Sequence, residues 1–414
     1  MSVSARDREI LRALAGQLAE AAAAESHRRT AELWRRLNTL DSVRPMVWIN
    51  EICWHEMNVD DELTCRCEDP FLRNREEAMR RTLYQWRHLP ADMVVDDFLP
   101  CPVAYTESDY GIRMNPVPST QAYGSRDYLS VIRDESDVGK ILLPSVSAEP
   151  DETARRMELL GGLMGDLLPV RRWGIASPPR STWDVLIEFY GIQELYEDMF
   201  DRPQLVHQAI DRMTQAVLHR HEQYETLGLL ELNNVNCRVG TGGLGYTGEL
   251  PAADFDGEHV RMKDCWGGQM AQIFSEVSPA MHDEFALQYE LRLMERFGLN
   301  YYGCCEPLHK KVHLLHRIPR LRKVSMSPFV NWREGAEAIG RRYVYSAKPN
   351  PAVLASDRWD GERARRDLRE ILQATKGCHV EIILKDIHTV RNQPQRLWEW
   401  ARIAMEEVRS FAGG

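Results

Sequence analysis

The feature that most constrains the fold is an alternation between short runs rich in β-branched or aromatic residues and longer stretches with helical periodicity. Strands that alternate with helices pair in parallel through right-handed crossovers. Eight such units are typical of a (β/α)8 barrel. The eight runs are 45–50, 92–98, 171–177, 229–234, 299–307, 322–328, 342–351 and 379–386. We therefore predict an α/β protein built as a single TIM barrel, with a doubly wound open sheet as the alternative.

The stretches between these runs carry the usual signals of helix ends. In 278–298, for example, Ser278 suits the N-cap and a proline follows it in the first turn. The N-terminal residues are charged, rich in alanine and periodic, which favours one or two amphipathic helices. We predict that residues 1–42 form a helical extension and that residues 43–414 form the barrel.

Composition excludes several classes of protein. The chain is 43% hydrophobic, yet it has no apolar run long enough to span a membrane. Its formal net charge of −10 argues against a nucleic-acid partner. Nine cysteines, an odd number, without the pattern of a secretory signal indicate reduced thiols. We expect a cytoplasmic protein.

One connection is longer than a barrel requires. Residues 235–277, after the fourth run, are rich in glycine and contain Tyr246, Phe255 and Trp266. Long loops in compact domains are usually functional, and glycines allow a closing motion. We predict a lid over the substrate, with a subunit-contact arm as the alternative.

Three ordered motifs resemble one superfamily. "GIQELYEDMFDRPQLVHQAIDRMT" (191–214), "KDCWGGQMAQIFSEVSPAMHDEFALQY" (263–289) and "SAKPNPAVL" (346–354) are similar to segments of the uroporphyrinogen decarboxylase-like superfamily. The resemblance extends over roughly residues 40–410. It implies the same barrel that the strand count predicts.

The superfamily contains tetrapyrrole decarboxylases, zinc-dependent methyltransferases that serve corrinoid proteins, and relatives of cobalamin-independent methionine synthase. The decarboxylases pair an arginine-rich N-terminal stretch with a polyanionic substrate. Here the first run continues into "WINEICWHEMN" (48–58), which has no arginine. An acidic protein without those cations would repel such a substrate. Tetrapyrrole decarboxylation is therefore not expected.

The resemblance also implies a zinc site. In the methyltransferases, a His-x-Cys at the end of the fifth strand and a cysteine near the end of the eighth bind zinc, which activates a thiol. Here Cys305 matches the first family cysteine, while Gly303 stands where the histidine would be. The predicted ligands are Cys305, Cys304, Glu306, His388 and Cys237. The alternative is that the two adjacent cysteines are buried strand residues.

Charged residues at other strand ends are candidates for catalysis. Asp97 ends the second run, where the superfamily carries an aspartate, and Lys348 falls in the seventh-strand motif. Asp386 follows Lys385 at the end of the eighth run. The alternatives are a solvated carboxylate for Asp97, a surface lysine for Lys348 and a local Lys385–Asp386 ion pair.

Five further residues are candidates for holding the substrate. Trp54 and His55 follow the first run, Asn233 ends the fourth, Asn350 lies in the seventh-strand motif, and Trp266 belongs to the predicted lid. Asparagine amides can orient a polar substrate. Turn chemistry is the alternative for asparagine, and helix surface is the alternative for Trp54 and His55.

The leading hypothesis is a methyltransferase or demethylase that moves a methyl group between a small molecule and a corrinoid, folate or thiol acceptor, assisted by zinc. Two alternatives stay open: a decarboxylase or lyase of a small carboxylic acid that uses Asp97 and Lys348, and a barrel that binds a corrinoid without turnover. A corrinoid protein and a second copy of the chain are the expected partners.

Overall fold

The computed structural model describes residues 3–118, 127–177 and 181–413. Their contacts divide the chain into two compact units. Unit 1 consists of Met1–Ala104, Glu149–Gly174 and Lys348–Gly414, and unit 2 consists of Tyr105–Ala148 and Ile175–Ala347. The predicted extension, residues 1–42, forms two helices but belongs to the same unit as the residues up to Ala104.

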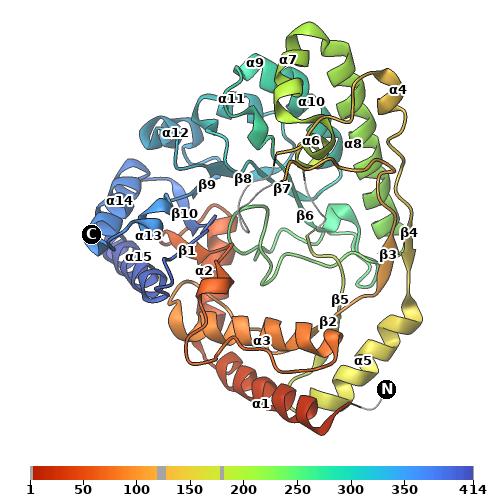
Figure 1. Cartoon of the computed structure of the whole chain (residues 1–414). Coiled ribbons are helices and arrows are strands. Elements are labelled where there is room, and N and C mark those ends of the chain that lie inside the picture. The colour runs from red at the N-terminus through yellow and green to blue at the C-terminus, as the bar shows by residue number, and fades with distance from the viewer. Residues whose placement is uncertain (1–2, 119–126, 178–180, 414) are drawn as a thin grey trace. The chain divides into compact units, whose positions relative to one another are not determined.

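Unit 1 is built from two parallel strand pairs and flanking helices. β1 pairs with β10, and β2 pairs with β5. Its elements are α1 (Ala5–Ala22), α2 (Ser26–Asn38), β1 (Met46–Ile49), η1 (Trp54–Glu56), α3 (Pro70–His88), β2 (Leu99–Pro102), α5 (Pro150–Met164), β5 (Val170–Trp173), α13 (Ala352–Ala355), α14 (Gly361–Ala374), β10 (His379–Leu384) and α15 (Gln395–Gly413). Helices α1 and α3 lie side by side (Figure 1) and share an apolar core that includes Leu11, Leu14 and Leu83.

Unit 2 contains four parallel strands in the order β6–β7–β8–β9 and a separate antiparallel pair, β3 with β4. Its elements are β3 (Tyr105–Glu107), α4 (Glu135–Val138), β4 (Val146–Ala148), α6 (Thr182–Tyr190), α7 (Ile192–Asp201), α8 (Pro203–Thr226), η2 (Met262–Asp264), β6 (Trp266–Gln269), η3 (Gln272–Phe274), α9 (Pro279–His282), the π-helix η4 (Asp283–Leu287), α10 (Gln288–Met294), β7 (Leu299–Tyr302), η5 (Leu308–Lys310), α11 (Val312–Leu315), β8 (Leu321–Met326), α12 (Trp332–Ile339) and β9 (Val344–Ala347). Helix α8 packs against α6, α7 and α10.

An α/β fold with parallel strands is confirmed, whereas closure into one barrel of eight strands stays a prediction. Four of the predicted runs contain a strand of four or more residues, namely β1, β7, β9 and β10, and the run 322–328 overlaps β8, which begins one residue earlier. The run 171–177 overlaps β5, which begins one residue earlier.

Two of the predicted runs, 92–98 and 229–234, are wrong as strands. The run 92–98 precedes β2, which begins only at Leu99. The buried Asp92 carboxylate accepts the Val47 amide at 2.8 Å and is paired with Arg44. The run 229–234 keeps a single bridge, Ile175 to Leu230.

The connection 235–277 is not a loop throughout, because its residues Trp266–Gln269 form β6 in the sheet of unit 2, and a lid made of the part before β6 stays a prediction. Before β6, Val239 and Leu250 are buried in an apolar cluster with Trp266 and Tyr301. Its glycines serve close packing as well as bending. A Cβ at Gly240, whose φ is +56°, would lie 2.4 Å from the Tyr301 ring.

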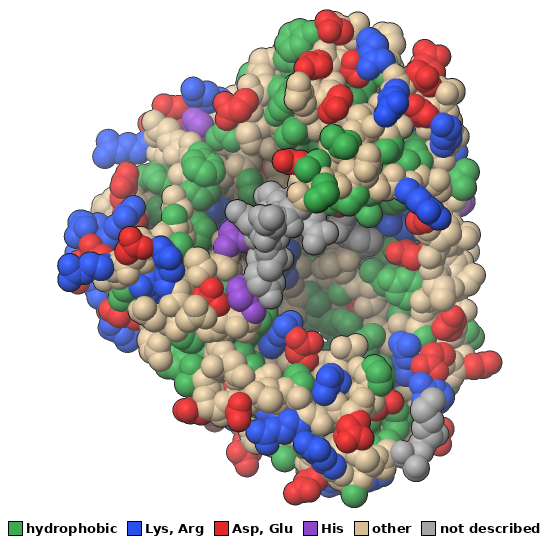
Figure 2. Space-filling model, in the orientation of Figure 1, with side chains coloured by type: hydrophobic (Ala, Val, Ile, Leu, Met, Phe, Trp, Pro, Cys, Tyr) green, Lys and Arg blue, Asp and Glu red, His purple; other side chains and the backbone are tan. Residues whose placement is uncertain are grey.

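No helix among the described residues is both long and apolar enough to cross a membrane. On the visible face, lysine and arginine side chains are interspersed with aspartate and glutamate (Figure 2).

Candidate active site in unit 2

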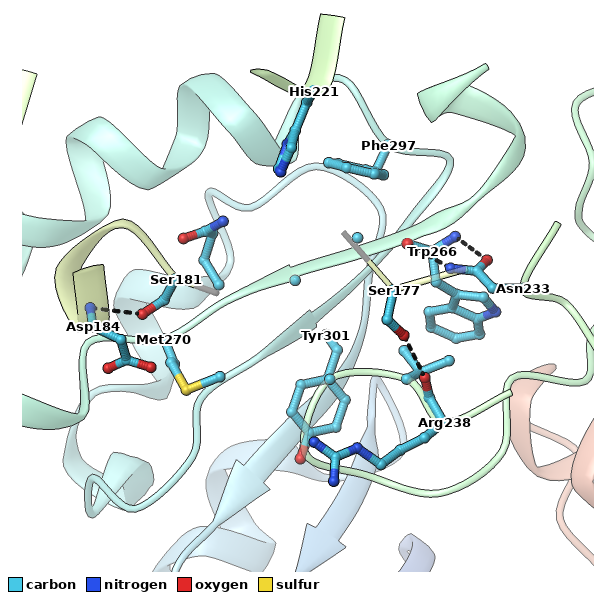
Figure 3. A pocket seen from close by; sticks show the side chains of 15 residues that line it. Ser177, Ser181, Asp184, His221, Asn233, Arg238, Trp266, Met270, Phe297 and Tyr301 are labelled. Atoms are coloured by element: carbon cyan, nitrogen blue, oxygen red, sulfur yellow. Dashed lines mark hydrogen bonds between the residues drawn. The ribbon is translucent and has the colours of Figure 1, made fainter. Parts of the chain in front are cut away.

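A cavity of about 350 Å³ lies in unit 2, around strand β6. Figure 3 shows His221 and Phe297 on one side of this strand and Tyr301 and Arg238 on the other. The lining residues are Ser177, Ser181, Asp184, His221, Asn233, Arg238, Val239, Gly240, Trp266, Gly267, Gly268, Gln269, Met270, Phe297 and Tyr301. Three aromatic side chains and a few polar groups are the usual composition of a small-molecule site.

The cavity depends on two adjacent glycines in β6. A Cβ at Gly267 would lie 2.3 Å from Cγ of Phe297, and a Cβ at Gly268 would lie 2.9 Å from the carbonyl oxygen of Tyr301. Successive strand residues face opposite sides of a sheet. The two glycines therefore bring aromatic side chains and neighbouring backbone close to β6 on both of its faces.

His221 projects into the cavity from α8 (Figure 3). Its side chain is 3% exposed, and neither ring nitrogen has a hydrogen-bond partner among the described residues. The ring contacts Tyr224 and Phe297 at centroid distances of 6.1 and 6.2 Å. Burial, aided by the charge of Arg220, lowers the pKa of His221 to about 3. It is therefore a neutral imidazole that offers one donor and one acceptor to a ligand.

The other polar groups of the cavity are partly engaged with the protein. Ser181 caps α6 by accepting the Asp184 amide at 3.1 Å, and the Asp184 carboxylate accepts the Gln272 side chain at 2.9 Å. Ser177 donates to the carbonyl oxygen of Arg238 at 3.4 Å, while the Arg238 residue itself is exposed. Among the residues that line the cavity, His221 is thus the best-buried polar side chain with hydrogen-bonding capacity left for a ligand.

Asn233 and Trp266, both predicted to hold the substrate, line this cavity, but their polar atoms bind the protein. The Asn233 amide donates to the carbonyl oxygens of Ala176 (2.8 Å) and Trp266 (2.9 Å) and accepts the Trp266 amide (2.8 Å). The Trp266 indole donates to the Gly245 carbonyl at 2.8 Å, and the buried Lys323 ammonium lies 5.7 Å from its ring. Asn233 fixes β6, and Trp266 supplies an apolar wall.

The predicted metal ligands Cys304, Cys305 and Glu306 follow β7 directly. The two Sγ atoms lie 3.4 Å apart. Glu306 is fully buried, and its oxygens accept the backbone amides of Cys304 (2.8 Å) and Ala271 (3.1 Å). Burial raises the pKa of Glu306, and these amides offset only part of that rise. Its carboxylate ties the loop after β7 to the loop after β6.

These contacts do not fit a zinc centre of three protein ligands. Among the described residues, no group of three or more histidine, cysteine, aspartate or glutamate side chains is placed to hold a metal. Cys237 belongs to unit 2, whereas His388 is an exposed residue of unit 1. Zinc binding therefore stays a prediction.

A buried polar chain lies near these residues in unit 2. Lys311 lies 3.3 Å from Nδ1 of His282, and Nε2 of His282 lies 2.7 Å from the Tyr302 hydroxyl. Tyr302 donates to Oε2 of Glu290 at 2.7 Å. Burial lowers the pKa of His282 to about 3 and that of Lys311 to about 8, and it raises the pKa of Glu290 to about 8. The donors therefore point from Lys311 through neutral His282 and Tyr302 toward a protonated Glu290.

The other predicted site residues belong to unit 1. Lys348 is 2% exposed at the end of β9, whereas the Asp97 side chain is 78% exposed and lies 3.7 Å from Arg171. Asn350 is exposed, and its side chain accepts the Ala352 amide at 2.9 Å. Lys348 is buried, so it is not the surface lysine of the alternative interpretation. Asp97 is a solvated carboxylate, and Asn350 makes a turn contact.

Trp54 and His55 lie in η1, just after β1. The Trp54 ring is packed edge-on against Tyr84 at 6.0 Å, and the Arg81 guanidinium lies 5.1 Å above it. His55 is partly exposed, with Nε2 at 3.7 Å from Glu56. Trp54 therefore packs against α3 within unit 1.

Asp386 belongs to a strained ionic cluster at the ends of β1 and β10. The buried Lys385 ammonium lies 2.8 Å from Asp386 and 3.4 Å from Glu51. Both carboxylate residues have positive φ, +56° and +51°, a conformation that non-glycine residues adopt at a cost. Although burial raises the pKa of Asp386, the hydrogen bond from Lys385 and the charge of that lysine hold it below its ordinary value.

The predictions missed His221, Lys323 and Glu290. In the sequence, His221 occupies an ordinary position of the amphipathic helix predicted over 202–228. A histidine among the apolar positions of that helix was the signal that could have identified it as a site residue. Lys323 is followed at two-residue steps by the buried Ser325 and Ser327, and such alternation of polar residues in a strand predicts a polar interior face.

Comparisons with known proteins add little to this geometry. No family model matches the chain, and no curated protein matches it. Among solved structures, a methyltransferase from Methanosarcina mazei is similar over 64% of this chain and 72% of that protein, with 12% identity and a TM-score of 0.37. At that identity and TM-score, the likeness by itself assigns no activity.

Proposed function

We propose that the chain is an enzyme that transfers a methyl group between a small molecule, bound in the unit 2 cavity, and a corrinoid, folate or thiol acceptor. The observation that carries the site is His221, a buried neutral imidazole whose two nitrogens have no partner among the described residues. The three motifs that resemble the uroporphyrinogen decarboxylase-like superfamily supply the reaction class.

The size of the cavity favours a small substrate. About 350 Å³ is at the lower end for ligand pockets. A macrocyclic carrier would have to present its reactive centre from outside, as a corrinoid-binding partner protein would. Trp266, Phe297 and Tyr301 would surround the apolar part of the substrate, and Arg238 would attract an anionic group.

The chemistry requires a group that stabilises the atom losing the methyl. In the balanced reaction, a donor R–X–CH₃, a nucleophilic acceptor A⁻ and a proton from solvent yield R–X–H and A–CH₃: the X–C bond breaks and the A–C bond forms. Negative charge develops on X as the methyl departs. A neutral imidazole N–H can hydrogen-bond to X in a site with little water, where such bonds are strong. We assign this role to His221.

A lyase acting on a small carboxylic acid is the second candidate, because Lys348 is buried and could hold a substrate carboxylate. Its proposed partner, Asp97, is exposed. A corrinoid-binding barrel without turnover would give no product in either assay below. The corrinoid protein, a homodimer and a cytoplasmic location are further parts of this proposal.

The test is a transfer assay with purified protein. Methoxyaromatic, methylamine and methylthiol donors are incubated with cob(I)alamin, tetrahydrofolate or a free thiol, and products are identified by mass spectrometry. His221→Phe should lower the rate by about 10²–10³-fold if its N–H stabilises the leaving atom. His219→Phe, on the same helix but outside the cavity, is the matched control and should change it little.

Two results would contradict the proposal. Full activity of His221→Phe would remove the imidazole from the reaction. Release of CO₂ from a carboxylic acid, without methyl transfer, would establish the lyase instead. Zinc is tested separately, by metal analysis of protein purified without chelator and of its Cys305→Ser variant.

A further inference from the structure

A second cavity in unit 2, of about 680 Å³, lies beside β3, α6 and α8. Tyr110, Ile112, Val185 and Phe189 form much of its apolar wall. It shares no lining residue with the cavity that contains His221.

Arg220 is the buried cation of this second cavity. Its side chain is 7% exposed, and Nε and Nη2 have no hydrogen-bond partner among the described residues. The guanidinium carbon lies 5.3 Å from the centre of the Tyr110 ring. Arginine keeps its charge in proteins, and a buried charge without hydrogen bonds is costly. The two N–H groups form an edge that matches a carboxylate.

Three carboxylates also line the cavity, but none of the ion pairs among the described residues includes Arg220. Glu107 accepts the hydroxyl of Tyr224, and Asp109 accepts the Gly111 amide at 2.8 Å. Together with Glu188 they outnumber the two arginines of the lining, Arg220 and the exposed Arg113, and they make the wall unfavourable for a doubly charged anion, since like charges repel. The surroundings therefore favour a single negative charge attached to an apolar body.

We propose that this cavity binds a small organic monocarboxylate, with its carboxylate on Nε and Nη2 of Arg220 and its apolar body against Ile112, Val185 and Phe189. The site does not depend on the proposed methyl transfer. Phenylacetate, which has one carboxylate and one aromatic ring, is a suitable probe, and the neutral phenylacetamide is its matched control.

The experiment measures binding of both probes to the full chain by isothermal titration calorimetry and ligand-observed NMR. We expect phenylacetate to bind at least tenfold more tightly than phenylacetamide. Arg220→Met should weaken phenylacetate binding at least tenfold, and Arg220→Lys should weaken it less because the charge remains. Ile112→Trp, which fills the cavity and keeps Arg220, should also abolish binding, and it tests the site even if Arg220→Met does not fold.

Several outcomes would overturn the proposal. Equal binding of the acid and the amide would show an apolar cavity without anion recognition. No binding of phenylacetate, or undiminished binding by folded Arg220→Met, would remove the site. Loss of binding in Arg238→Gln, with Arg220→Met unaffected, would place the probe in the first cavity instead.

Discussion

Asp92 holds the start of β1 through one carboxylate and its own backbone. Its oxygens accept the Val47 amide and the Arg44 guanidinium, its amide donates to the Val47 carbonyl at 3.0 Å, and its carbonyl accepts the Trp34 indole at 2.8 Å. The side chain is 3% exposed. A buried charge with these partners stabilises the fold only while all of them are present.

Asp92→Asn should therefore lower the free energy of unfolding by about 3 kcal/mol, because Arg44, whose side chain is only 14% exposed, would lose its counter-ion. Asp97→Asn is the matched control. Its side chain is 78% exposed, so the change should be no more than about 0.5 kcal/mol. Urea denaturation measures both, and equal losses in the two variants would contradict this account.

Glu290 predicts how stability depends on pH. Burial raises its pKa from an ordinary value of 4.5 to about 8, so the folded chain binds a proton that the unfolded chain releases in this window. The contribution of this group is therefore fully present below about pH 4.5 and is lost as pH rises through 8. Between about pH 4.5 and pH 8, each pH unit should lower the contribution of Glu290 to the free energy of unfolding by about 1.4 kcal/mol.

Glu290→Gln should remove this part of the pH dependence, since glutamine does not titrate, while it can still accept the Tyr302 hydroxyl. Denaturation curves at several pH values from 5 to 8.5 measure the slope. The prediction fails if the variant keeps the slope of the unmodified chain.

At the level of elements, sequence patterns were reliable where propensity and burial agree. The run 379–386 is rich in buried apolar residues and became the six-residue strand β10, and in the run that overlaps β8 the buried Val324 and Met326 alternate with polar residues. β6, whose sequence is WGGQ, was missed because two glycines carry no strand propensity. Its place is set by tertiary contacts, namely the Asn233 side chain and pairing with β7.

The site was harder to predict for a related reason. Asn233 was predicted from its place at the end of the fourth run and Trp266 from its place in the predicted lid, and both line the cavity. His221 comes from the middle of a helix, where periodicity describes only burial. The absence of hydrogen-bond partners for its ring nitrogens among the described residues results from three-dimensional packing. No local sequence pattern predicts that absence.

The glycines of β6 give a prediction at this scale. Gly267→Ala should destabilise the chain by about 1–3 kcal/mol, because the new methyl would meet the Phe297 ring. Gly161→Ala, in helix α5 with no atom within 4 Å of the added Cβ, is the control and should stabilise by about 0.5–1 kcal/mol. Partial rescue of Gly267→Ala by Phe297→Leu would support the steric cause, and no loss in Gly267→Ala would exclude it.

At the scale of the whole molecule, each unit is assembled from segments that are separated in the sequence. β1 pairs with β10 and β2 pairs with β5, so the first segment of unit 1 holds neither partner strand. A fragment of residues 1–104 should therefore lack cooperative unfolding, although α1 and α3 could retain helical content. Circular dichroism during urea titration measures this, and a sharp transition in the fragment would contradict it.

Because the segments of the two units alternate along the chain, the two units become complete at different times during synthesis. Unit 2 has all its residues once Ala347 has emerged from the ribosome. β1, made near the start, waits until His379–Leu384 follows before it has a strand to pair with. The nascent chain thus carries an unpaired strand through most of translation, and a chaperone that recognises extended apolar segments would find MVWI exposed for longer than any strand of unit 2.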